Sequence, residues 1–196
     1  MSPIEGTFNL VDHDGNPVTE QTYRGSWMMV FFGFTHCEVV CPRALSRLSS
    51  VLAEIGHERA QCIRPLYITV DPDRDTPPVM KQFVESRYPR FTGLTGTTEQ
   101  IENAKNAFNV FARPKADAAA PDGYVVPHTA ITYLLDPTGT YRTHWTDTRD
   151  VVEIVPMLTA EIDGLNRARD VLGGPRPHSS AQYEACGDTC GTPSSP

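Results

Sequence analysis

Two cysteines separated by three residues, Cys37 and Cys41, are the side chains of this sequence best suited to chemistry. They follow an apolar run, WMMVFFGF, and Pro42 comes directly after the second cysteine. Proline is tolerated in a first helical turn but disrupts a helix interior, so a regular helix should start near Pro42. Unpaired amides and the helix dipole at such a start favour anionic sulfur and lower a thiol pKa.

This spacing permits two kinds of chemistry. Residues i and i+4 of a helix lie on one face, about 6 Å apart along the axis, so both sulfurs can converge on one ion. The same spacing falls within the roughly 4.4–6.8 Å between Cα atoms that a disulfide tolerates. The pair therefore holds a metal or forms a disulfide, but not both at once. Because Thr35, His36 and Glu38 make the junction polar, we expect both cysteines to be exposed.

A third ligand would decide which metal fits. Soft thiolates select Cu(I), Zn(II) or iron–sulfur clusters, whereas imidazole suits copper and zinc. His128 is the best candidate, because the segment YVVPHTAITYLLD places it just before a strand expected beside the cysteine strand. His36 is adjacent in sequence, but neighbouring side chains diverge. The other histidines fall on a turn, a helix end, a hairpin arm and the tail: His13, His57, His144 and His178.

Three further cysteines complete the set of five. We expect Cys62 to pack at the start of the strand that follows it. Cys186 and Cys190 repeat the C-x3-C spacing near the end of the chain. Such a pair could collect a metal ion or reduce a Cys37–Cys41 disulfide by exchange. A disulfide within the tail, or two idle thiols, is the alternative.

The hydrophobic pattern predicts an α/β domain. Residues 27–34 and 64–71 are apolar on both faces, as in central strands that helices cover on both sides. A helix over residues 43–55 joins them, and the right-handed crossover makes the two strands parallel. Hairpins are expected over 6–18 and 130–145, a loop over 113–124, and helices over 77–87, 98–110 and 151–169, the first two each opened by a threonine and the last kinked at Pro156.

This order follows the thioredoxin plan: a central mixed β-sheet flanked by helices, with an N-terminal β-hairpin. We therefore predict one domain over residues 1–172. Residues 173–196 are rich in Gly, Pro and Ser and are predicted to form a flexible tail that carries the second C-x3-C.

The charge of the chain argues against nucleic acid as a partner. Its formal net charge is −7 and its pI about 5.3, whereas phosphate backbones are bound by clustered Lys and Arg. Residues 1–9 lack the basic start and apolar middle of a signal peptide, and no apolar run approaches the ~20 residues that cross a bilayer. The chain as given is expected to be soluble.

Three separated motifs, FFGFTHCEVVCP, LYITVDPDRDTP and PHTAITYLLDPTG, occur in order and closely resemble the SCO/SenC copper-chaperone family. The resemblance covers roughly residues 4–165. It implies a thioredoxin-like fold that binds one copper per chain, as Cu(I) or Cu(II), through Cys37, Cys41 and His128. It also implies a role in assembling the dicopper site of cytochrome c oxidase.

The partners implied by the resemblance are subunit II of that oxidase or a related copper-site protein. Other copper chaperones and thiol reductants are further candidates. The implied location is the periplasmic face of the inner membrane, or the equivalent mitochondrial intermembrane space. We expect the native anchor to be absent from this sequence.

The chain departs from the family pattern at two places. Glu38, Val39 and Val40 replace a common Pro-Asp-Ile, and Pro127 stands where an Asp usually precedes the histidine. Losing that carboxylate should alter copper affinity or redox preference. The acidic run at residues 71–78 is expected to be structural rather than ligating, because Thr76 caps a helix that begins with proline.

Other functions remain open at this stage. Cys37 and Cys41 could be the redox pair of a thiol-disulfide oxidoreductase, and the chain would be an enzyme only in that case. The spacing is wider than C-x-x-C, which favours an ion. A peroxidase of the peroxiredoxin type is disfavoured because Thr35 lies only two residues before Cys37 and Val30 occupies the expected proline position. A pure interaction module would need none of this chemistry.

Overall fold

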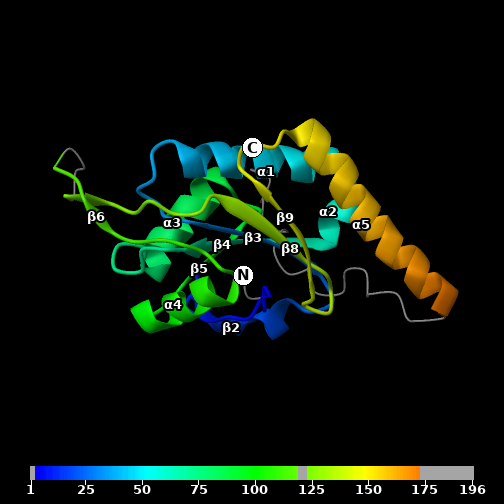
Figure 1. Cartoon of the computed structure of the whole chain (residues 1–196), viewed down its shortest axis with the longest axis horizontal. Helices are drawn as coiled ribbons and strands as arrows, with labels where there is room; N and C mark the ends of the chain where they lie inside the picture. Colours follow the sequence, from blue (N-terminus) through cyan, green and yellow to red (C-terminus); the bar gives the residue numbers. More distant parts are fainter. Residues whose placement is uncertain (1–2, 119–122, 173–196) are drawn as a thin grey trace, which may run out of the picture.

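A seven-stranded mixed β-sheet runs through the computed structural model, which describes residues 3–118 and 123–172 (Figure 1). In chain order the elements are β1 (Asn9–Asp12), β2 (Pro17–Thr19), the 3-10 helix η1 (Glu20–Tyr23), β3 (Trp27–Gly33), α1 (Val40–Glu54), α2 (His57–Gln61), β4 (Ile63–Thr69), α3 (Pro77–Arg87), β5 (Thr92–Thr95), α4 (Thr98–Ala107), β6 (Lys115–Ala116), β7 (Tyr124–Val125), β8 (Ile131–Leu135), β9 (Tyr141–Thr146) and α5 (Val151–Leu172).

The strand order in the sheet is β2-β1-β5-β4-β3-β8-β9. Strands β3, β4 and β5 are parallel, whereas β1 pairs antiparallel with β5 and β8 pairs antiparallel with β3. The N-terminal hairpin thus extends one edge of the sheet and the β8–β9 hairpin the other. This confirms the predicted α/β fold with a mixed sheet, flanking helices and an N-terminal hairpin.

Strand β3 is buried on both faces because helices cover both sides of the sheet. Helices α1, α3 and α5 lie over one face and α4 over the other (Figure 1). Alternate residues of β3 enter the two cores, Trp27, Met29 and Phe31 on one side and Met28, Val30 and Phe32 on the other. The continuous apolar run in the sequence reflects this two-sided burial.

Three loops meet at one edge of the sheet. The parallel strands β3 and β4 end there at Gly33 and Thr69, and the antiparallel β8 begins there at Ile131. The cysteine turn follows β3, the acidic loop follows β4, and the segment with His128 precedes β8. In open α/β sheets, ligands bind outside the carboxyl ends of the strands, and this edge is that place.

Several element bounds differ from the sequence prediction. Helix α1 starts at Val40 rather than at residue 43, and α4 ends at Ala107 rather than at residue 110. Strand β5 and helix α2 were not predicted, and the predicted loop over 113–124 contains β6, which pairs with β7. Helix α5 runs three residues beyond its predicted end, to Leu172. No helix of the described chain is both long and apolar enough to span a membrane.

The two threonine caps behave differently. Thr97 accepts a hydrogen bond from the Gln100 amide and forms a capping box at α4. Thr76 stands at the N-cap of α3, but its side chain makes no capping hydrogen bond, so that part of the prediction is wrong. One of the two amides that could donate to it is missing, because Pro78 occupies the second helical position and has no amide hydrogen.

Candidate metal centre

The cysteine pair spans the junction between β3 and α1. Cys37 lies in the turn before the helix, where its amide donates to the Phe34 carbonyl at 3.2 Å. Cys41 lies in the first turn of α1, and its amide donates to the Cys37 sulfur at 3.3 Å. Both thiols are free. The predicted placement, with the helix starting close to Pro42 and Cys37 before it, is confirmed.

The two sulfurs are unequally buried. Cys37 is half-buried, whereas Cys41 is fully buried in the core beneath α1, with 0% of its surface exposed. The expectation that both cysteines are exposed is therefore wrong for Cys41. The polar residues between and before them shape only the outer side of the turn, while the i+4 position turns inward toward the sheet.

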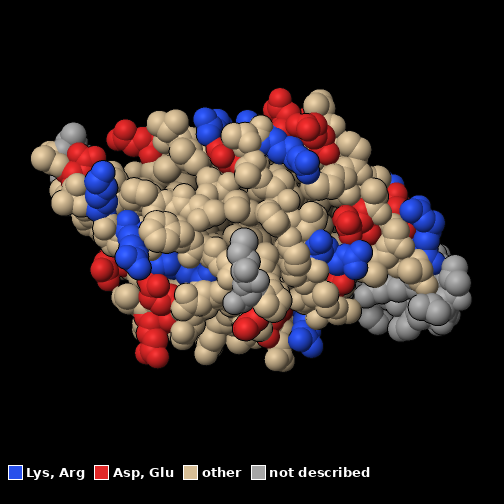
Figure 2. All heavy atoms as spheres, in the orientation of Figure 1, with Lys and Arg blue, Asp and Glu red and all other residues tan. Residues whose placement is uncertain are grey.

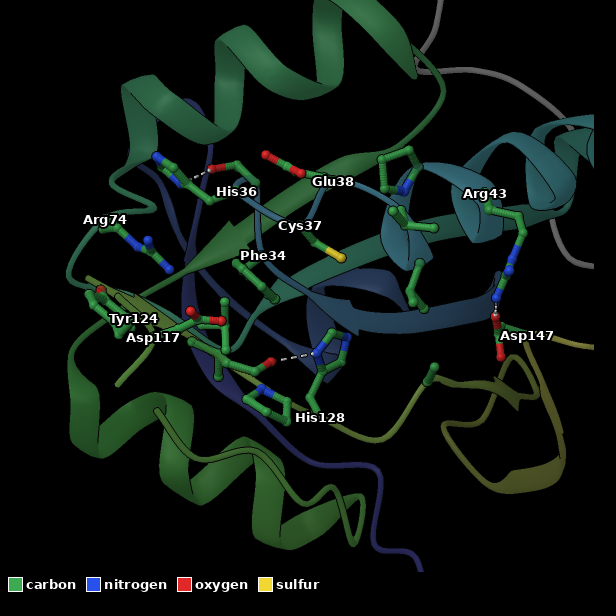
Figure 3. A pocket seen from close by; sticks show the side chains of 18 of the residues that line it. Phe34, His36, Cys37, Glu38, Arg43, Arg74, Asp117, Tyr124, His128 and Asp147 are labelled. Atoms are coloured by element: carbon green, nitrogen blue, oxygen red, sulfur yellow. Dashed lines mark hydrogen bonds and ion pairs between the residues drawn. The ribbon is translucent and has the colours of Figure 1, made fainter. Parts of the chain in front are cut away.

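His128 faces the buried cysteine. Its Nε2 lies 3.7 Å from the Sγ of Cys41, and its Nδ1 lies 3.0 Å from the carbonyl oxygen of Val126 (Figure 3). A proton on Nδ1 would be donated to that carbonyl, which leaves the lone pair of Nε2 directed at the sulfur. The ring also packs edge-on against Phe34, with 5.6 Å between ring centroids.

The distance between sulfur and nitrogen suits a shared metal ion. Bonds of the length found for zinc, about 2.3 Å to sulfur and 2.0–2.1 Å to nitrogen, at angles of roughly 110–120°, place the two donor atoms about 3.5–3.8 Å apart. The observed 3.7 Å lies within that range. An ion could therefore bind to Cys41 and His128 without movement of either element.

The two thiols have opposite pKa shifts because they share one hydrogen bond. The Cys41 thiol donates to the Cys37 sulfur, and this bond, helped by backbone amides of residues 39–41, lowers the pKa of Cys37 to about 5 against the effect of burial. The same bond and burial raise the pKa of Cys41, opposed by the Phe34 amide and the Tyr67 hydroxyl. At neutral pH Cys37 is a thiolate and Cys41 holds its proton.

A cavity of about 810 Å³ opens in front of the pair. Cys37 and His128 line its wall (Figure 3), whereas the fully buried Cys41 is not among the lining residues. At the rim, Arg43 forms an ion pair with Asp147. On the face shown in Figure 2, basic and acidic side chains are interspersed around a broad uncharged centre. Because Cys37 lines the cavity and Cys41 does not, a molecule that enters the cavity meets the Cys37 sulfur first.

A buried carboxylate holds the cysteine turn in place. Asp75 is fully buried and accepts hydrogen bonds from the Thr35 amide at 3.0 Å, the Thr35 hydroxyl at 2.5 Å and the Thr69 hydroxyl at 2.6 Å. Burial raises the pKa of Asp75. The acidic loop thus ties β4 to the residues just before Cys37. This agrees with the structural role predicted for the loop.

Comparison with known protein families gives one match over most of the sequence. The family model described as SCO1/SenC matches residues 1–163. The chain belongs to the SCO1/SenC family. Its thioredoxin-like fold is shared with solved structures of that family, as the resemblance implied.

Relatives in this family come from bacteria and mitochondria. The mitochondrial SCO2 homolog of Mus musculus is 36% identical over 161 residues, covering 81% of this chain and 62% of the relative. The SCO2-like protein of Rickettsia prowazekii is 36% identical over 143 residues, covering 72% of this chain and 69% of the relative. The chain spans 62% of the mouse relative and 46% of SCO2 from Saccharomyces cerevisiae.

Two solved structures of the family were described with copper bound. ScoI of Arabidopsis thaliana matches with a TM-score of 0.77 and 30% identity, covering 82% of this chain and 99% of that chain. Yeast Sco1 with copper matches with a TM-score of 0.75 and 28% identity, covering 93% of this chain and 99% of that chain.

The structure brings together the three residues predicted as metal ligands, Cys37, Cys41 and His128. His36 lies beside them in sequence but its ring interacts with Thr35 and Asp75 instead. His13, His57 and His144 lie on the β1–β2 turn, at the start of α2 and in β9. Cys186, Cys190 and His178 lie outside the described residues.

Cys62 is placed differently from the prediction. It does not pack at the start of β4 but is exposed, as the C-cap residue of α2, and its thiol donates to the Glu58 carbonyl at 3.4 Å. The short helix α2, which the sequence analysis missed, is the reason. It turns the side chain outward one residue before β4 begins.

Two residues beside the site were not found from the sequence. A Cβ on Gly33 would lie 2.7 Å from the Cys41 sulfur and 2.7 Å from the Tyr67 hydroxyl oxygen, so only glycine leaves room for these atoms. Tyr67 is a fully buried residue of β4. In the sequence, both belong to ordinary apolar strands, and nothing in the local pattern marks them.

Proposed function

We propose that this chain is a copper metallochaperone that binds one copper ion through Cys37, Cys41 and His128 and delivers it to the dicopper site of cytochrome c oxidase. The observation that carries this proposal is the 3.7 Å separation between Cys41 Sγ and His128 Nε2, beside the free, half-buried Cys37. The copper-bound forms of the plant and yeast relatives support it.

The donor set suits copper in both oxidation states. Two thiolates favour Cu(I), and the imidazole extends the set to Cu(II). Cys37 is already a thiolate at neutral pH because its pKa is about 5. Cys41 must release its proton to solvent when the ion binds, because the metal ligand is the thiolate. The nitrogen of His128 is ready to bind, since the lone pair of Nε2 points at the Cys41 sulfur.

Delivery requires that ligands exchange one at a time. Cys37 lines the open cavity, so an incoming thiolate or imidazole reaches the copper from its side. We propose subunit II of the oxidase, or a related copper-site protein, as the recipient. We also propose a location in the mitochondrial intermembrane space or, in a bacterium, at the periplasmic face of the inner membrane; the relatives named as mitochondrial support the organelle.

Copper titration of the reduced protein tests the ligand assignment. A variant with serine at residues 186 and 190 removes the tail thiols, which would otherwise bind copper themselves. This variant should bind one equivalent tightly, and His128→Ala in the same background should lose Cu(II) before Cu(I). His57→Ala is the matched control, because His57 is exposed at the start of α2. If His128→Ala binds both ions as the parent does, the assignment is wrong.

The asymmetry of the two thiols favours a second candidate function, a thiol-disulfide reductase. Cys37 is accessible and has a lowered pKa, and Cys41 is buried and protonated. In such a reaction the Cys37 thiolate attacks a partner disulfide and releases one partner thiolate. The Cys41 sulfur, after losing its proton, then attacks Cys37 in the mixed disulfide. A Cys37–Cys41 disulfide forms, and the partner leaves as a dithiol.

The two functions differ in their need for the histidine. Reduction of a disulfide-containing copper-site peptide by the metal-free protein should survive in His128→Ala, whereas tight Cu(II) binding should not. Cys37→Ser should abolish both. A parent protein that leaves the peptide disulfide intact at a stoichiometric excess would rule out the reductase.

A further inference from the structure

Tyr67 places a rigid polar group in the core beside the metal centre. Its ring stacks between Phe31, at 6.2 Å and 12° between rings, and Phe83, at 5.6 Å and 24°. The residue is fully buried in the central strand β4. Stacking on both faces prevents the ring from swinging away, so the hydroxyl position is fixed by the fold.

The Tyr67 hydroxyl forms no hydrogen bond of ordinary geometry with the residues that the structure describes, although it lies close enough to the Cys41 sulfur to lower the pKa of that thiol. A buried hydroxyl without a partner destabilises the folded chain, because its hydration is lost and nothing replaces it. Native structures rarely keep such a group unless it serves a ligand or a functional state. A tyrosine hydroxyl ordinarily titrates at about pH 10, so at neutral pH it keeps its proton and is a donor.

The Cys41 sulfur is an acceptor close to this hydroxyl. A Cβ atom placed on Gly33 would lie 2.7 Å from the Tyr67 hydroxyl oxygen and 2.7 Å from the Cys41 sulfur. The oxygen and the sulfur are thus at most twice that distance apart, and residue 33 has no side chain to separate them. As a thiol, Cys41 offers only a weak acceptor, whereas a thiolate is a strong one.

We propose that the Tyr67 hydroxyl donates a hydrogen bond to the Cys41 sulfur when that sulfur is the anionic ligand of bound copper. This inference rests on the proposed function. Metal binding removes the Cys41 proton to solvent and leaves negative charge on a sulfur that water cannot reach. The Tyr67 hydroxyl then faces an anionic acceptor in place of a thiol. In the folded chain without copper, the hydroxyl therefore stands in place as a donor for the copper-bound form.

Such a hydrogen bond would change the redox preference of the bound copper as well as strengthen its binding. A donor at a cysteine ligand withdraws electron density from the sulfur, and hydrogen bonding around the sulfur sets the redox preference of copper–thiolate sites. Removing the donor makes the thiolate more electron-rich. The sulfur-to-Cu(II) charge-transfer band should then move to longer wavelength, and the site should favour Cu(II) over Cu(I) more than the parent does.

The test compares Tyr67→Phe with Tyr133→Phe, both in the variant without tail cysteines. Tyr133 is also buried and ring-packed, but it belongs to the core on the opposite face of the sheet. Tyr67→Phe should weaken Cu(I) binding about tenfold or more in competition with a chelator, because hydrogen bonds to charged groups are the strong ones. Tyr133→Phe should leave Cu(I) affinity and the charge-transfer band unchanged.

Thermal unfolding of the metal-free protein supplies a readout that does not depend on copper. Tyr67→Phe removes an unpaired buried hydroxyl, so the melting temperature should stay the same or rise although copper binding weakens. A lower melting temperature would mean that the hydroxyl is already paired without metal and would overturn the inference. Unchanged copper affinity and an unchanged band would overturn it as well.

The two proposals can fail separately. If His128→Ala disturbs copper binding but Tyr67→Phe does not, only the role of Tyr67 is refuted. If the parent protein binds no copper at this centre, the proposed function fails, and the role of Tyr67 fails with it.

Discussion

Replacing Cys41 with alanine tests the electrostatics of the metal centre most directly. The largest cause of the lowered Cys37 pKa is the hydrogen bond from the Cys41 thiol, and three backbone amides act in the same direction. Cys41→Ala removes the thiol donor and leaves the amides. A hydrogen bond to a charged group is worth about 1.5–3 kcal/mol, and one pKa unit corresponds to 1.36 kcal/mol. The pKa of Cys37 should therefore rise by about 1–2 units, from about 5 toward about 6–7.

The expected change is large in an alkylation assay. At pH 6 about 90% of Cys37 is thiolate in the parent, against about 10–50% in Cys41→Ala. The rate of reaction with iodoacetamide follows the thiolate fraction, so rates between pH 4 and 9 on the reduced, metal-free protein give the apparent pKa. Mass spectrometry of the peptide containing Cys37 separates it from exposed Cys62. Cys62→Ser is the control and should leave the Cys37 profile unchanged.

Two results would refute this reasoning. If the parent Cys37 titrates near 8.5, as an ordinary thiol does, the turn does not stabilise its thiolate. If the parent titrates near 5 but Cys41→Ala does too, the backbone amides of the turn hold the thiolate and the Cys41 thiol is not the donor.

Further predictions concern the support of the site. Gly33→Ala should lower the free energy of unfolding by about 1–3 kcal/mol, measured by urea denaturation, because the new Cβ would lie 2.7 Å from Cys41 and Tyr67. Asp75→Asn should lower the free energy of unfolding by about 1–3 kcal/mol in the same assay. Asp75 accepts three hydrogen bonds through two oxygens, whereas asparagine has only one acceptor oxygen for them. The pKa of Cys37 is near 9 in the unfolded chain and about 5 in the folded chain. Its ionisation therefore stabilises the reduced fold fully above about pH 9, and this contribution is lost as the pH falls to about 5. Cys37→Ser should therefore flatten the dependence of the melting temperature on pH between 5 and 9.

The cysteine turn and His128 could be predicted because their signals are local. Pro42 fixes where the helix starts, and the apolar runs identify two central strands. His128 follows from its position just before a strand that pairs with β3. Strand β5 was missed because it has four residues, one of them a glycine, and lies between two predicted helices.

Other features depend on packing across the sheet, which a linear pattern does not encode. The depth of Cys41 depends on how α1 lies over β3 and β4, so the polar residues around it in sequence were misleading. Tyr67 and Gly33 lie on different strands and meet only because β3 and β4 pair in parallel, with Phe31 opposite Tyr67. The role of Asp75 likewise requires that the loop after β4 fold back onto Thr35.

The imidazole and the buried sulfur come from positions 87 residues apart in the chain. An unfolded polypeptide therefore does not hold these two donor atoms together, and the His128 nitrogen reaches the Cys41 sulfur only after β8 has paired with β3. Occupancy by Cu(II) would thus report completed folding, and by mass action it would stabilise the finished fold against proteolysis. The complete set of three candidate ligands is thus available only in the folded chain.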